Sequence, residues 1–149
     1  MSGGTGAAAL LALAAGLAGS VQVAVMGRLG ERVGSLEALA FAALLAALIA
    51  AATLLVARGS LDGVAAAARQ PVWLWLGGAM SAFIVFTVTI AGPRIGTAAT
   101  IALLIAGQLA MGVVIDRFGL FGLERIGLNP ARVAGVLLLA VGAALMLRR

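Results

Sequence analysis

Five long apolar segments, separated by short connections that hold nearly all the charges, constrain this chain more than any other feature. Each segment can cross a hydrocarbon core of about 30 Å as an α-helix rising about 1.5 Å per residue. With 10% of its residues charged, the chain cannot cover such helices with a water-exposed surface. The sequence therefore predicts an all-α integral membrane protein with one domain over residues 1–149. The predicted transmembrane spans are residues 7–26, 36–57, 72–92, 95–115 and 131–147.

The residues that flank these spans predict where the helices begin and end. Ser35 can cap the second span, with Glu37 in its first turn near the positive helix end. Asn129 and Pro130 predict the start of the fifth span in the same way, as a cap followed by proline. Pro93–Arg94 is expected to form a two-residue turn between the third and fourth spans. The first residues carry no positive charge, so the first segment is expected to be a retained span and not a cleaved signal.

Small residues recur every four positions in several spans, which predicts close helix packing. Lipid provides no hydrophobic drive for helix pairing, so close backbone approach across small side chains supplies much of the contact. The glycines expected at such contacts are Gly16, Gly77, Gly78 and Gly96. Several faces of this kind indicate more packing surface than one protomer needs. A GC-rich genome would also raise the content of alanine, glycine and arginine, which accounts for part of the pattern.

The arginines show no preference for one side of the membrane. If the spans alternate in direction, five arginines fall on each side, whereas cytoplasmic loops normally carry the excess. Equal numbers predict that chains insert in both orientations and form an antiparallel homodimer with ten helices, as in inverted-repeat transporters. The alternative is a single orientation that is set by features outside this count. Because cysteine is absent, introduced cysteines can test the two interpretations.

Polar side chains inside the spans are the candidates for a solute pathway. An unpaired amide in hydrocarbon costs roughly 4–8 kcal/mol against an alkane reference, so Gln108 in the fourth span needs a partner or water. Thr97, Thr100, Leu104 and Gln108 share one helix face. The predicted pathway residues are Gln22, Trp75, Thr89, Thr100 and Gln108. The alternatives are a glutamine that bridges two helices, a threonine that bonds to its own helix, and a tryptophan that anchors the membrane interface.

Charged and reactive residues restrict the possible chemistry. Glu37 and Asp116 are candidate coupling or gating charges, although both lie near span ends, where they can also be a first-turn charge and a helix exit. Cysteine, histidine and tyrosine are absent, and no nucleophile, base and metal-ligand set is apparent. The sequence thus predicts no enzyme, cofactor or metal site. The arginines are scattered singly, which argues against nucleic-acid binding.

Four stretches resemble one known family. They are residues 21–32, PVWLWLGG at 71–78, GPRIG at 92–96, and GQLAMGVVIDRFGLFG at 107–122. The chain resembles, over essentially its whole length, the short five-span bacterial inner-membrane proteins of YdcZ type in the drug/metabolite transporter superfamily. Gly27 and Arg117 depart from the family pattern, which usually has asparagine and often histidine there. The signature positions that the resemblance assigns are Gln22, Trp73, Trp75, Gly77, Gly78, Pro93, Gly96, Gln108 and Asp116.

The resemblance implies a small-molecule transporter, often an exporter, in the bacterial inner membrane. Family members occur singly, as pairs or as fused ten-span chains, which is consistent with the antiparallel arrangement predicted from charge. We therefore expect a multi-pass transporter that moves an unidentified small solute across the lipid bilayer by alternating access as a dual-topology homodimer. The alternative is a non-transporting membrane scaffold, or one subunit of a heterodimeric transporter pair.

Overall fold

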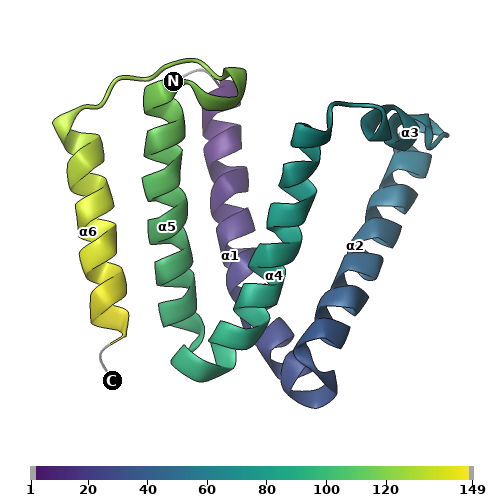
Figure 1. The fold of residues 1–149 in the computed structure, drawn as a ribbon, viewed down its shortest axis with the longest axis horizontal. Helices are drawn as coiled ribbons and strands as arrows, with labels where there is room; N and C mark the ends of the chain where they lie inside the picture. Colours follow the sequence, from purple (N-terminus) through teal and green to yellow (C-terminus); the bar gives the residue numbers. More distant parts are fainter. Residues whose placement is uncertain (1–2, 148–149) are drawn as a thin grey trace. The chain divides into compact units, whose positions relative to one another are not determined.

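The computed structural model describes residues 3–147, and these residues form helices joined by short connections (Figure 1). The α-helices are α1 (Gly3–Val33), α2 (Ser35–Arg58), α3 (Asp62–Ala68), α4 (Leu76–Ile95), α5 (Thr97–Phe118) and α6 (Pro130–Met146). Two short 3-10 turns are η1 (Val72–Trp75) and η2 (Leu120–Gly122). The structure contains no strand within these residues, so the predicted all-α class is confirmed for this part of the chain.

Four segments of the described chain are long and apolar enough to cross a membrane: Gly4–Val33, Ser35–Arg58, Val72–Ile95 and Thr97–Phe118. α6 is also apolar but has 17 residues, which corresponds to a length of about 25 Å and to the lower end of the usual range for transmembrane helices. Large apolar side chains such as Leu10 (70% exposed) and Leu138 (72% exposed) point away from the protein along these helices. This surface suits lipid and not water. The crossing by α6, and with it the count of five spans, stays a prediction.

The chain divides into two compact units. The first contains the N-terminal part of α1 together with α5 and α6, and the second runs from Val25 to Pro93. In the first unit, α5 and α6 pack side by side and run in opposite directions, joined by the connection that contains η2 (Figure 1). This pair of helices positions the site described below.

In the second unit, two glycines let the end of α1 lie against the end of α4. A Cβ atom at Gly30 would lie 2.5 Å from Cγ2 of Thr89, and one at Gly27 would lie 3.0 Å from Cδ of Pro93. Thr89 is 2% exposed, so its methyl group has little room to move. A close contact across small residues thus forms at two glycines that were not predicted to pack, because Gly27 and Gly30 lie in the charged stretch that was expected to be a connection.

The predicted first connection is wrong, because α1 continues through it to Val33. Arg28 and Glu31 are spaced for one helix face, and Nη1 of Arg28 lies 3.0 Å from Oε2 of Glu31. The helix ends at Gly34, whose φ of +101° is a conformation that favours glycine. Gly34 also takes the cap position that was predicted for Ser35, and no side chain caps α2.

The predicted turn at Pro93–Arg94 is also wrong, because both residues lie in the last turn of α4. Pro93 has a φ near the helical value but no N–H to donate to the carbonyl of Thr89, so α4 contains it without that hydrogen bond, and the chain turns at Gly96, where φ is +88°. The second predicted connection contains the additional helix α3. The predicted start of α6 is confirmed, since Oδ1 of Asn129 accepts a hydrogen bond from the backbone N–H of Arg132 at 2.8 Å.

We expect Gly30→Ala to lower the free energy of unfolding by about 1–3 kcal/mol, because the added methyl group overlaps the buried Thr89 side chain. Denaturant unfolding of the purified protein in detergent measures this change. Gly19→Ala is the matched control on α1, since its Cβ would meet no heavy atom within 4 Å. Equal stability of the two variants would contradict the proposed contact.

Candidate functional site

A pocket of about 320 Å³ lies between α5 and α6, inside the first unit. This volume is at the lower end of the range for small-molecule sites. The pocket is lined by Gln108, Leu109, Gly112, Val113, Asp116, Arg132 and Gly135. Its lining combines an amide, a carboxylate and a guanidinium group with apolar and small residues, so it offers both hydrogen bonds and apolar contact.

One face of α5 contributes the polar side of this pocket. Gln108, Gly112 and Asp116 are spaced four residues apart, so they lie one above another on the helix. They continue the face on which the sequence analysis placed Thr100 and Gln108. Gly112 and, on α6, Gly135 leave open space between the helices, since a Cβ atom at either position would meet no heavy atom within 4 Å.

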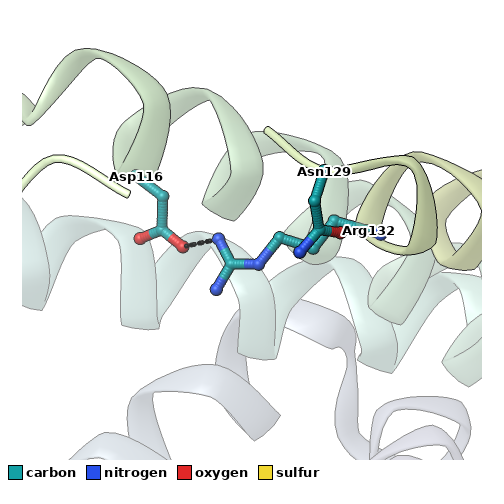
Figure 2. Close-up of polar contacts among 3 residues, drawn as sticks. All are labelled: Asp116, Asn129 and Arg132. Atoms are coloured by element: carbon teal, nitrogen blue, oxygen red, sulfur yellow. Dashed lines mark hydrogen bonds and ion pairs between the residues drawn. The ribbon is translucent and has the colours of Figure 1, made fainter. Parts of the chain in front are cut away.

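An ion pair between the two helices forms the charged end of the pocket. Nη1 of Arg132 donates a hydrogen bond to Oδ2 of Asp116 at 3.0 Å (Figure 2). The Arg132 and Asp116 side chains are 37% and 34% exposed, so water and small molecules can reach both. Two backbone contacts hold the pair in place: Asn129 caps the first turn of α6, and the N–H of Ile126 donates to the carbonyl of Asp116 at 2.8 Å.

The two charges are placed against the dipoles of their own helices. Asp116 lies in the last turn of α5, where the helix end is partly negative, and Arg132 lies in the first turn of α6, where it is partly positive. Each placement typically disfavours its helix by about 0.3–1 kcal/mol at exposed sites. The stability of the separate helices therefore does not account for these residues. Their favourable interaction is the contact with each other across the pocket.

The amide of Gln108 has no hydrogen-bond partner among residues 3–147; the same holds for Gln22 on α1, but Gln108 lines the pocket and Gln22 does not. The Gln108 side chain is exposed. In hydrocarbon an unpaired amide costs roughly 4–8 kcal/mol against an alkane reference. Neither α6 nor any other described part of the protomer supplies this partner. The amide is therefore available to bind a molecule in the pocket that it lines.

The two predicted threonines bond to their own helices, as the alternative interpretation held. Oγ1 of Thr89 donates to the carbonyl of Val85 at 2.7 Å, and Oγ1 of Thr100 donates to the carbonyl of Gly96 at 2.8 Å. Their side chains are buried, with 2% and 4% exposed. The back-bonding is thus confirmed, and a role in the solute pathway stays a prediction.

The structure places the remaining predicted residues outside this pocket. Gln22 is exposed on α1, Trp75 is exposed in η1, and Glu37 is confirmed in the first turn of α2. A Cβ atom at any of the four predicted packing glycines would meet no heavy atom within 4 Å, so packing at these positions stays a prediction. No group of three or more His, Cys, Asp or Glu side chains that could hold a metal ion occurs among the described residues.

Of the predicted site residues, the pocket brings together Gln108 and Asp116. Arg132, Gly112 and Gly135 also line the pocket and were not predicted as parts of this site. The signal for Arg132 was its position in the first turn of α6, three residues after the capping Asn129, where an arginine is unfavourable for the helix.

Exchanging the two charges tests whether the contact across the pocket is what stabilises them. We expect the double variant Asp116→Arg with Arg132→Asp to be at least as stable as the wild type, because it keeps the pair and aligns both charges with the helix dipoles. Each single variant should lose about 1 kcal/mol of unfolding free energy, since it leaves two like charges side by side. Denaturant unfolding of the four proteins measures these differences. A double variant that is less stable than both single variants would contradict this explanation.

Comparison with known proteins identifies the family to which the chain belongs. The family described as "Putative inner membrane exporter, YdcZ" matches residues 7–145. The chain is similar to the protein named "Inner membrane protein YdcZ" of Escherichia coli (strain K12), with 37% identity over 78 residues, or 52% of this chain. The match spans 51%, about half, of the length of that relative. No solved structure matches the chain. With its apolar membrane-length helices, the chain is a multi-pass inner-membrane protein that belongs to the YdcZ family.

Proposed function

We propose that the chain is a small-solute transporter and that the pocket between α5 and α6 is part of its solute pathway. The unpartnered amide of Gln108 is the observation that carries this proposal, because a solute or water in the pocket would satisfy it. Export is the direction that the family description favours. A transporter needs no reaction chemistry, and a pocket with a few polar groups on an apolar wall is suited to binding and release.

We further propose that two copies of the chain, in opposite orientations, form the transporting unit, with α6 as the fifth span of each. The equal division of arginines between the two sides supports this arrangement. The open space at Gly16, Gly77 and Gly78 also supports it, because these positions leave room for a helix of the second copy. Alternating access then arises as the two oppositely oriented halves exchange conformations around the solute.

In this mechanism the ion pair joins α5 to α6 at the end of the pocket. Exposed pairs contribute about 0–1 kcal/mol, so the Asp116–Arg132 contact can open and close without a large energetic penalty. Asp116 then acts as a gating charge at a helix end. A coupling role for Glu37 is less suited to its place in the first turn of α2.

Replacing Gln108 tests the pathway. In proteoliposomes screened with a panel of small solutes, we expect Gln108→Leu to reduce the flux of the transported solute about tenfold or more, because the polar contact in the pocket is lost. Gln70→Leu is the matched control, since Gln70 is exposed outside the long helices and its amide bonds to the carbonyl of Ala66 at 3.4 Å. A folded Gln108→Leu protein with unchanged flux would remove this residue from the pathway.

Single cysteines test the orientation. Gly127→Cys and Leu147→Cys place thiols at opposite ends of α6, both at exposed positions, and no native cysteine competes. If the topology is dual, a membrane-impermeant thiol reagent added to intact cells should label about half of the molecules at each position. Complete labelling at one position together with none at the other would show a single orientation and contradict the antiparallel homodimer.

A further inference from the structure

We propose that Arg132 binds the anionic group of an amphipathic molecule whose apolar part lies along Leu109 and Val113. Such a molecule could be a free amphiphile with a carboxylate or phosphate group, or a membrane lipid with a phosphate headgroup. If the bound molecule is also the transported solute, this inference rests on the proposed function; binding alone does not require transport. The binding itself depends on the pocket between α5 and α6 and on the ion pair at its end.

Arg132 keeps hydrogen-bonding capacity that the ion pair does not use. The contact is a single bond from Nη1 to one carboxylate oxygen of Asp116, although a guanidinium group can donate two parallel bonds to a carboxylate or phosphate. The side chain is 37% exposed at the end of the pocket. An incoming anion can therefore bind Arg132 together with the Asp116 carboxylate, or take the place of that carboxylate.

The surrounding charges favour an anion over a cation. The segment from Asp116 to Arg132 carries two acids, Asp116 and Glu124, against three arginines, so its net charge is positive. Arg125 adds to this charge close to the end of α5, since its Cγ would lie 2.7 Å from a Cβ atom at Gly119. Charges separated by less than about 10 Å are incompletely screened at ordinary ionic strength. A cation would have to displace Arg132 from Asp116 within this positive surface.

The rest of the pocket suits an apolar chain. From Asp116 to Gln108 the pocket follows α5 over two helical turns, or about 12 Å. Leu109 and Val113 supply apolar contact along this distance, while Gly112 and Gly135 leave width between the helices. The charged group is thus bound at the helix ends and the apolar part is directed toward the middle of the span, which is the orientation of an amphiphile in a membrane.

Binding of dodecyl phosphate tests this proposal. Native mass spectrometry of the purified full chain in neutral detergent gives its dissociation constant, with dodecyltrimethylammonium as the matched cationic probe. We expect the wild type to bind the phosphate at least about tenfold more tightly than the cation. Arg132→Gln should weaken phosphate binding about tenfold, because a charge-assisted hydrogen bond is lost. Arg117→Gln is the control, since Arg117 is exposed at the end of α5, next to Asp116 in the sequence, and does not line the pocket.

If Arg132→Gln does not fold, two other measurements still test the proposal: the binding of both probes to the wild type, and the binding of dodecyl phosphate to Asp116→Asn. Asp116→Asn removes the competing carboxylate, so it should bind dodecyl phosphate at least as tightly as the wild type. Equal affinity of the wild type for the two probes would overturn the proposal, as would an equal loss in the Arg132 and Arg117 variants. The first result would show that the pocket does not select anions, and the second that the attraction is not specific to Arg132.

Phosphatidylglycerol separates the two sources of the anion. Displacement of dodecyl phosphate by this lipid, but not by phosphatidylcholine, supports the site and assigns it to an anionic membrane lipid. Retention of dodecyl phosphate in excess phosphatidylglycerol supports the site and assigns it to a free amphiphile. Since binding is measured without transport, a protein that binds dodecyl phosphate but carries no solute in the flux screen contradicts the proposed function and leaves this inference intact.

Discussion

In hydrocarbon, each backbone N–H and C=O group has to find its hydrogen-bond partner within the protein, because lipid offers none. This constraint explains why the chain forms long helices and, at two of its connections, changes direction at a single glycine. Between α1 and α2 the turn is Gly34, and between α4 and α5 it is Gly96, both with positive φ. Gly59 and Gly119 end α2 and α5 in the left-handed conformation, and their N–H groups bond back to carbonyls of the last turn. The turns at Gly34 and Gly96 and the helix ends at Gly59 and Gly119 thus leave few backbone groups without a partner.

The same constraint explains why the sequence predicted the long helices of the fold but not the residues at which they end. Hydropathy predicted the long helices, because lipid-facing surface needs a continuous apolar composition. It misplaced their ends, because a helix continues past the membrane boundary wherever its charges are solvated. Arg28 and Glu31 therefore lie inside α1, although they were expected in a connection. Pro93 was expected to lie in a turn, but α4 continues through it to Ile95 and Gly96 makes the turn.

Two residues of the candidate site could be predicted, because a polar or charged side chain in or at the end of an apolar span conflicts with its surroundings. Gln108 was identifiable because an amide in a span conflicts with its environment, and Asp116 because it ends an apolar run. Arg132 was not identifiable as their neighbour, since it is 16 positions from Asp116 and joins it only when α5 and α6 pack. Thr89 and Thr100 satisfy their hydroxyl groups locally and need no other partner. The contrast with Gln108 depends on hydrogen bonds that composition cannot reveal.

The placement of Asp116 and Arg132 against their helix dipoles has a consequence for how the family can diverge. Loss of either residue alone leaves a charge that is unfavourable for its own helix and has no partner, whereas loss of both relieves α5 and α6 together. Substitutions at these two positions are therefore coupled, and a lineage that keeps one charge is under pressure to keep the other. In this chain the pair is present despite this local disadvantage, so the two charges contribute to the end of the pocket and not to the stability of the helices that form it.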